Sequence, residues 1–330
     1  MKNRYGLNSH RSDLVAARLQ HRVRRFAYAQ GYGSDEQAEK FVLDGNAGVP
    51  PGSFVKGKLL AVQVAKIEST SDNDIEAIIQ DYVQATSLLA RYADIIVVNV
   101  SCPNASGYRG LQKIDPLTKI LSSVVDVASS VNRNSRPAIM VKVSPDQDSE
   151  EQVSSICAAV WTSGVDGVVV GNTTLSEPSP LPEGTSLSKD ETAAMEERGG
   201  YSGPQLYPRT LSLVKRYRRT LDYPLHDHDE SQQTQFQHQE AKRNNMKEAL
   251  DESIKSSSTS VLDRSPHHLE QSSTPHISTQ QTTLTPKTIF CSGGIPTGEQ
   301  AMEVIKAGAS VAQIYTGMPC PALRALSTAN

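Results

Sequence analysis

Six short apolar runs recur along the chain, each bounded by turn-forming residues. They cover residues 59–66, 94–101, 138–144, 166–174, 288–295 and 310–317. Their β-branched and almost continuous apolar character is typical of strands that are covered on both faces. Longer stretches with helical periodicity separate them, at residues 74–92, 116–131, 150–163, 204–219 and 298–307. This alternation predicts a parallel sheet with helical crossovers.

Polar or glycine-rich residues follow the carboxyl ends of these strands, as in NVSCPN, KVSPD, GNTT, SGGI and YTG. Functional residues gathered at that edge are typical of a (β/α)8 barrel or of an open α/β sheet. No G-x-G-x-x-G follows the first strand, which weakens the dinucleotide-binding open sheet. We therefore expect an incomplete (β/α)8 TIM barrel with about six recognisable strands. Residues 1–57 hold a basic helix at 14–29 and supply at most one more strand.

The composition changes sharply at residue 222. Residues 222–286 contain no glycine, two aromatic residues and six of the eight histidines of the chain. Such a polar stretch cannot bury enough apolar surface to offset the entropy lost on ordering it. We expect a disordered insertion, with at most a short helix at 240–254, between the first part of the barrel, 1–221, and its closing strands, 287–330.

Charge and cysteine content narrow the class of protein. The 330 residues carry 33 Lys and Arg against 36 Asp and Glu, a net charge of −3, so nucleic acid is not expected as the main partner. The four cysteines form no CxxC pair and no zinc-ligand spacing, so we expect neither a disulfide scaffold nor a metal site. The chain has no long apolar run and no evident targeting segment, and it has the character of a soluble, reduced, intracellular protein.

The densest polar cluster runs from Asn99 to Asn104, at the end of an apolar strand. A side-chain amide offers two donors and an acceptor, which suits a planar ring with alternating N–H and C=O groups. Cys102 lies on the same loop, where a thiol can serve as a nucleophile or as a proton-transfer base. The alternative is a buried, inert thiol.

Two other strands end in polar groups of the same kind. Lys142 stands between apolar neighbours, which places its ammonium for an anion or an electron-rich ring, or leaves it as a lysine whose head reaches solvent. Asn172 and Thr173 follow a Val run and are either ligand contacts or turn residues.

Glycine-rich loops precede a helix at 199–203 and end the last two strands at 293–294 and 315–317. Glycine lets backbone N–H groups come close to an anion, and the last loops of a barrel commonly hold a phosphate. These loops therefore point to a phosphorylated cofactor.

Taken in order, the motifs resemble dihydroorotate dehydrogenase, the flavin enzyme of pyrimidine synthesis. The resembling stretches are NRYGLNS, VVNVSCPNASGYRGLQ, IMVKVSPD, GVDGVVVGNTT, GGYSG and SGGIPTGEQAMEVIKAGASVAQIYTG. They cover most of the chain outside the insertion. Their details are similar to the membrane-associated, quinone-reducing class of the mitochondrial inner membrane, and the insertion is similar to that of fungal members.

The resemblance implies a role for each matching position. Cys102 matches the base that takes a proton from dihydroorotate as it is oxidised to orotate. The substrate contacts would be Asn3, Arg4, Tyr5, Gly6, Leu7, Asn99, Asn104, Asn172 and Thr173. The FMN contacts would be Gln63, Asn99, Lys142, Gly171, Gly203, Gly293, Gly294, Tyr315 and Thr316. Quinone would be the second substrate, and the pathway would be de novo synthesis of UMP.

The chain also departs from the family pattern. Cys102 stands where the quinone-reducing class has Ser, Gln63 replaces Asn, Gly171 replaces Thr, and Leu7 replaces an aromatic residue. The first strands of the family barrel and its membrane-binding helices have no counterpart in this sequence, so we expect a chain truncated at its amino end and altered after residue 317. Two other functions stay open: a non-catalytic remnant of this enzyme, and another flavin barrel that acts on pyrimidines.

Overall fold

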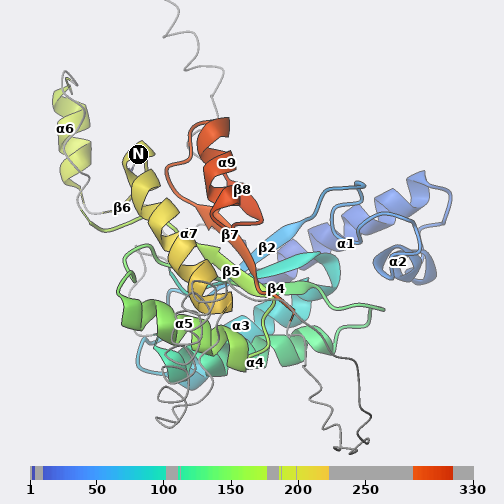
Figure 1. Ribbon diagram of the computed structural model, residues 1–330. Helices are drawn as coiled ribbons and strands as arrows, with labels where there is room; N and C mark the ends of the chain where they lie inside the picture. Colours follow the sequence, from blue (N-terminus) through green and yellow to red (C-terminus); the bar gives the residue numbers. More distant parts are fainter. Residues whose placement is uncertain are drawn as a thin grey trace, which may run out of the picture. The chain divides into compact units, whose positions relative to one another are not determined.

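Six parallel strands form one curled sheet, half of a barrel wall (Figure 1). In sheet order they are β2 (Ala61–Ala65), β3 (Ile95–Asn99), β4 (Ala138–Val143), β5 (Gly167–Val170), β7 (Thr288–Ser292) and β8 (Val311–Gln313). The computed structural model describes residues 2–3, 10–101, 111, 113–176, 186, 188–197, 199–222 and 285–314. The incomplete barrel with six strands predicted from the sequence is confirmed.

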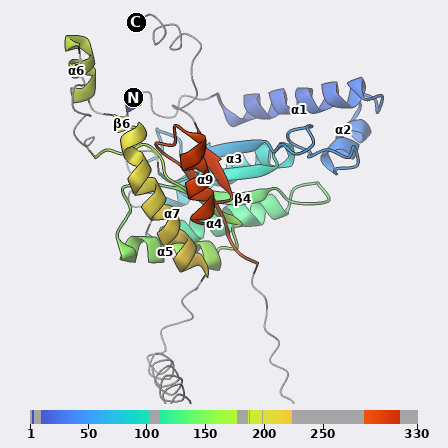
Figure 2. The same ribbon diagram turned by 45° about the horizontal axis from the view of Figure 1, so that its top comes forward.

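Helices connect the strands and pack on the outer face of the sheet (Figures 1 and 2). They are α3 (Ile75–Leu89), α4 (Ile114–Ser129), α5 (Glu150–Thr162), α7 (Tyr207–Asp222) and α9 (Gly298–Lys306), with the short helices η1 (Ala90–Tyr92) and η3 (Pro204–Leu206). Several of their starts follow from capping residues: Asp74, Ser149 and Thr297 each accept a hydrogen bond from a backbone N–H of the first turn. The five α-helices of this set were all expected from the sequence.

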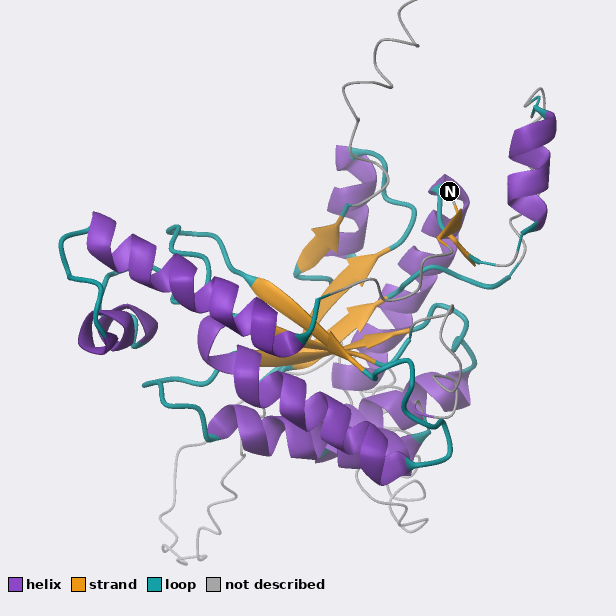
Figure 3. Cartoon of the chain, turned by 180° about the vertical axis from the view of Figure 1, so that it is seen from behind, coloured by secondary structure: helices purple, strands orange, loops and turns teal. Residues whose placement is uncertain are grey.

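The two faces of the sheet bury different sets of side chains. Outward-facing residues such as Ile96, Val141 and Val168 join the helices in the main hydrophobic core. Ile95, Val97, Met140 and Val169 form a second cluster on the inner face. Figure 3 shows the strands of the sheet and their helices from behind. Burial on both faces accounts for the continuous apolar runs of β3 and β5, in which every residue is buried.

Carboxylates close the amino ends of two central strands. Asp94 accepts hydrogen bonds from the backbone N–H groups of Gly52, Ser53 and Leu60 at 2.8–2.9 Å. Asp166 accepts from the backbone of Ile139 at 2.7 Å and from the guanidinium of Arg136 at 2.6 and 2.9 Å. The two carboxylates thus provide acceptors for backbone N–H groups that have no partner within the sheet.

Two helices and a small sheet lie outside the barrel pattern. Helices α1 (Ser12–Ala29) and α2 (Glu36–Leu43) share a core of their own with Tyr92 (Figure 2). The basic helix predicted at 14–29 is α1, whereas α2 was not predicted. Strand β1 (Lys2–Asn3) pairs antiparallel with β6 (Gly200–Tyr201), and α6 (Lys189–Glu196) precedes β6. These short elements carry too few residues to show a period.

All these elements belong to one unit, Met1–Pro224 with Pro286–Asn330, and α7 ends at Asp222. The predicted insertion, including the helix expected at 240–254, lies outside the described residues apart from its ends.

Replacing Asp94 by Ala should destabilise the fold strongly. It removes the acceptor of three backbone N–H groups, and each buried donor left unpaired costs about 1–3 kcal/mol. We expect the free energy of unfolding to fall by at least about 2 kcal/mol in urea denaturation. The control is Asp126→Ala on the exposed side of α4, which should change it by less than about 0.5 kcal/mol. Equal effects for the two variants would refute the role given to Asp94.

Candidate active site at the carboxyl ends of the strands

Asn99 and Lys142 are directly opposite each other in the register of β3 and β4. Asn99 also stands opposite Ala65 of β2, so its side chain shares the inner face with both neighbours. Asn99 is 2% exposed, and its backbone carbonyl oxygen accepts a hydrogen bond from Tyr82 Oη at 2.8 Å. Lys142 is half-buried. The sheet thus brings an amide and a cation to one inner row at the carboxyl edge.

A buried network joins the ends of β3 and β5. Asn99 Oδ1 accepts from both the backbone N and the Oγ of Ser101, each at 3.0 Å. Asn172 Nδ2 donates to the carbonyl O of Ser101 at 2.9 Å and to its Oγ at 2.8 Å. Ser101 is 3% exposed and therefore links two of the predicted ligand-binding amides away from solvent.

Thr173 contributes an unused polar atom to the same place. Its backbone N–H donates to Asn172 Oδ1 at 2.8 Å, while its own Oγ1 is buried and has no hydrogen-bond partner among the described residues. A buried hydroxyl without a partner is costly unless a ligand or water completes it. The hydroxyl of Thr173 is therefore available to a ligand at the strand ends.

Further polar residues, outside the amide network, hold the loop that follows β5 in place. Asp146 accepts hydrogen bonds from the hydroxyl of Thr174 and from the backbone N–H of Leu175, and it forms an ion pair with Arg209 of α7 at 3.2 Å. Arg209 also pairs with Asp148 at 2.8 Å. These bonds tie the loops after β4 and β5 to the start of α7.

The small sheet places the amino-terminal segment beside this loop. Asn3 pairs with Gly200, and Tyr201 exchanges backbone hydrogen bonds with Thr174 at 2.9 and 2.7 Å. The backbone of Asn3, the first residue of the predicted substrate segment, thus lies one strand away from the end of the Asn172–Thr174 loop.

Three glycines meet at the start of α7. A Cβ on Gly294 would lie 2.6 Å from both Gly203 O and Tyr207 N, and a Cβ on Gly293 would lie 2.7 Å from Thr210 Oγ1. Both Gly293 and Gly294 have positive φ, +131° and +68°. Only glycine allows such an approach of two loops to a helix start, where backbone N–H groups favour an anion.

Two further predicted positions lie at other points of the sheet. Gly171 has φ +105°, its carbonyl oxygen accepts from Ser292 Oγ at 3.1 Å, and a Cβ there would strike Ser292 O. A Thr at this position, as in the family pattern, would need another backbone conformation. Gln63 is exposed and opposite Val97, one inner row before Asn99.

Several predicted site residues lie outside the described residues and are not placed. They are Cys102, Asn104, Arg4, Tyr5, Gly6, Leu7, Tyr315 and Thr316. Cys102 directly follows Ser101 in the sequence.

The described cysteines are of a different kind. Burial raises the pKa of Cys157, on α5, to about 12 and the pKa of Cys291, on β7, to about 11. Both thiols are free and buried in the outer core, so they stay protonated at neutral pH.

Sequence reasoning missed Ser101, Asp146 and Arg209. Ser101 stands inside the NVSCPN cluster and could have been singled out as a hydroxyl between two amides. The Asp146–Arg209 contact spans 63 residues, and nothing in the sequence pairs the two.

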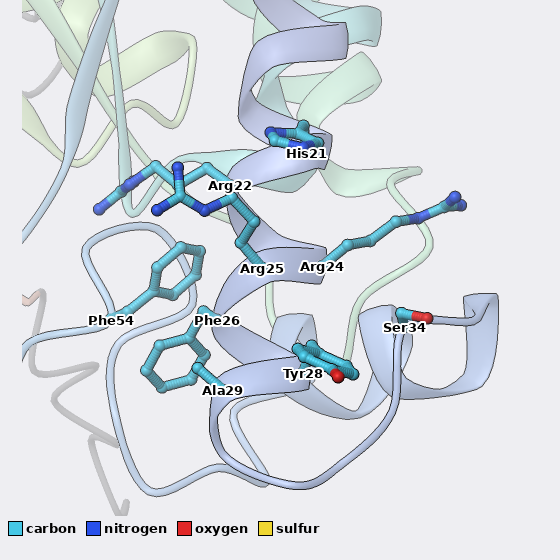
Figure 4. A pocket seen from close by; sticks show the side chains of 9 residues that line it. All are labelled: His21, Arg22, Arg24, Arg25, Phe26, Tyr28, Ala29, Ser34 and Phe54. Atoms are coloured by element: carbon cyan, nitrogen blue, oxygen red, sulfur yellow. The ribbon is translucent and has the colours of Figure 1, made fainter.

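A concavity of about 890 Å³ lies on α1 (Figure 4). Its lining holds His21, Arg22, Arg24, Arg25, Phe26, Tyr28, Ala29, Ser34 and Phe54. Arg22 donates to the carbonyl oxygens of Gly52 and Ser53 at 2.6 and 2.8 Å, and Arg24 pairs with the buried Glu39 at 2.9 Å. Two of the three arginines are thus committed to holding neighbouring segments in place.

Metal and membrane features are limited within the described ranges. No group of three or more His, Cys, Asp and Glu side chains there could hold a metal ion. None of the described helices is long and apolar enough to cross a bilayer.

Comparisons with known proteins identify the family and the fold. The family model for dihydroorotate dehydrogenase matches residues 1–225. The mitochondrial dihydroorotate dehydrogenase (quinone) of Schizosaccharomyces pombe is 35% identical over 234 residues, which are 68% of this chain and 48% of that protein. The enzyme of the same name from Lachancea kluyveri is 34% identical over 232 residues, 68% of this chain and 46% of that protein. The chain thus spans about half the length of these curated relatives.

A solved structure gives the same result for the fold. The ligand-free DHODH of Eimeria tenella superposes with a TM-score of 0.61 at 22% identity, over 96% of this chain and 64% of that chain. Because the family model covers more than half of the chain and the barrel wall agrees with it, the chain belongs to the dihydroorotate dehydrogenase family.

Proposed function

We propose that this protein oxidises dihydroorotate to orotate with FMN as cofactor, a step of de novo pyrimidine synthesis. The observation that carries the proposal is the convergence of Asn99, Asn172 and the Thr173 hydroxyl, unpartnered among the described residues, at one edge of the sheet. This set of donors and acceptors suits a flat ring with alternating N–H and C=O groups. Family membership makes dihydroorotate the first choice for that ring.

The residues present fit a flavin phosphate and its ring. Gly203, Gly293 and Gly294 lie together at the start of a helix, where a Cβ on Gly293 or Gly294 would strike neighbouring protein atoms. Their backbone N–H groups would hold the phosphate together with Tyr315 and Thr316. Lys142, in register with Asn99, would place a positive charge toward the ring, with Gln63 and Gly171 as further contacts. When bound, FMN would supply the acceptor for the hydride that leaves C6 of the substrate.

Cys102 is the proposed base. As a thiolate it would take the C5 proton of dihydroorotate as the C5–C6 double bond forms. A cysteine thiol has an ordinary pKa near 8.5 and ionises far more readily than the serine hydroxyl found in the quinone-reducing class. Asn3, Arg4, Tyr5, Gly6, Leu7 and Asn104 would complete the substrate pocket.

The relatives in the comparison are named as quinone-dependent and mitochondrial. On that basis we propose quinone as the electron acceptor and the mitochondrial inner membrane as the location of this protein.

Reconstitution with FMN tests the proposal directly. The full chain should become yellow, and its flavin absorbance near 450 nm should bleach anaerobically on addition of dihydroorotate. A chain that stays colourless after reconstitution, or a bound flavin that dihydroorotate does not bleach, would count against the activity and favour a non-catalytic relative.

Replacing Cys102 by Ala should slow flavin reduction by about 10²–10⁴-fold, because the C5 proton loses its acceptor. Stopped-flow bleaching at saturating dihydroorotate measures this rate. Cys157→Ala, in the outer core away from the strand ends, is the matched control and should leave the rate within about twofold. A normal rate for Cys102→Ala would remove this residue from the mechanism.

Thiol labelling separates the cysteines by environment. Burial raises the pKa of both Cys157 and Cys291, so iodoacetamide at about pH 8 should leave them unmodified in the native chain. Peptide mass spectrometry should find them modified only after denaturation in urea. Rapid native labelling of either one would show that the outer core is open around it.

A further inference from the structure

We infer that Ser101 is a positioning residue whose hydroxyl fixes the hydrogen-bonding polarity of Asn99 and Asn172, so that Asn99 presents N–H donors and Asn172 a carbonyl acceptor to the bound ring. The inference deepens the proposed function and rests on it for the identity of the ring. The polarity itself follows from hydrogen bonds within the chain.

The orientation of Asn99 is set by a backbone donor. The N–H of Ser101 lies 3.0 Å from one atom of the Asn99 amide, and a backbone N–H can only donate, so that atom is Oδ1. Ser101 Oγ lies 3.0 Å from the same oxygen. Both Nδ2 hydrogens of Asn99 therefore point away from Ser101, and Nδ2 donates to no described residue.

A second backbone donor sets the orientation of Asn172. The N–H of Thr173 donates to Asn172 Oδ1 at 2.8 Å, so the other amide atom is Nδ2. Asn172 Nδ2 donates both of its hydrogens to Ser101, at 2.9 Å to the backbone carbonyl O and at 2.8 Å to Oγ. What Asn172 has left for a ligand is the second lone pair of Oδ1.

The hydroxyl makes the chain of bonds directional. Ser101 Oγ accepts from Asn172, so its single hydrogen goes to Asn99 Oδ1. At 3% exposure, water does not compete for either bond, and bonds in such a network strengthen one another. Neither amide can turn over without leaving a buried donor facing a donor.

The matching ligand edge has a carbonyl oxygen next to an N–H. Asn99 would donate to the carbonyl and Asn172 Oδ1 would accept from the N–H, as on the imide edge of a dihydropyrimidine. The Thr173 hydroxyl, buried and unpartnered among the described residues, offers a third contact. A site of this kind rejects a ring that lacks the N–H, because its own acceptor is then left unpaired.

A double-mutant cycle tests the network without any ligand. In thermal unfolding of the full chain, Ser101→Ala should lower the midpoint clearly in the wild-type background and much less in the Asn172→Ala background. Ser163→Ala removes a similarly buried hydroxyl that has no partner in the described part of the chain, and its effect should be the same in both backgrounds. Equal effects of Ser101→Ala in the two backgrounds would overturn the inference.

Ring analogues test the polarity. We expect the FMN-loaded chain to bind orotate at least about 100-fold more tightly than orotate methylated at the imide nitrogen, measured by calorimetry. Ser101→Ala should raise the KM for dihydroorotate about tenfold or more and leave the saturating reduction rate within about threefold, and Ser101→Thr, which keeps the hydroxyl, should restore the KM.

The outcomes separate the two claims. Equal binding of the two rings, or a Ser101→Ala defect confined to the saturating rate, would overturn the polarity and leave the proposed function standing. Failure to bind either ring would overturn the proposed function and the identity of the ring with it, while the unfolding cycle still decides whether Ser101 couples the amides.

Discussion

Parallel pairing in register is the constraint on which the rest of this structure depends. In a parallel sheet every strand runs the same way, so the carboxyl ends of β3, β4, β5 and β7 must meet at one edge. Hydrogen-bonded register then decides which side chains share a row, and it puts Asn99 beside Lys142 although they are 43 positions apart in the sequence. The pairing of the apolar strands already sets the relative positions of these residues, and the polar loops add hydrogen bonds between them.

The strands and their helices were predictable because their burial requires long, regular patterns of apolar residues in the sequence. Every residue of β3 and of β5 is buried, and a strand covered on both faces is the structure that best fits such an uninterrupted run of Val and Ile. Strands β1 and β6 have only two residues each, and nearly 200 positions separate them in the sequence. No local sequence pattern could therefore predict them. Helix α2 is short and packs against its own small core instead of the sheet.

The candidate site was predictable as a set of residue types but not as an arrangement. Asn99, Lys142, Asn172 and the glycine pair stood out because polar residues follow apolar runs at those positions. The role of Ser101 depends on which way two backbone N–H groups point, and the support from Arg209 depends on a loop-to-helix contact. A single sequence predicts neither the direction of a backbone N–H group nor a contact between residues far apart in the chain.

The two ends of the sheet are built from different chemistry. Carboxylates of Asp94 and Asp166 tie down the amino ends, whereas amides, hydroxyls and Lys142 lie at the carboxyl ends, supported by the Asp146–Arg209 ion pair. Under the proposed function, residues at opposite ends of the strands would therefore hold the barrel wall together and recognise the small molecule. On that proposal, substitutions at the carboxyl ends could change the recognised molecule while Asp94 and Asp166 continue to anchor the scaffold.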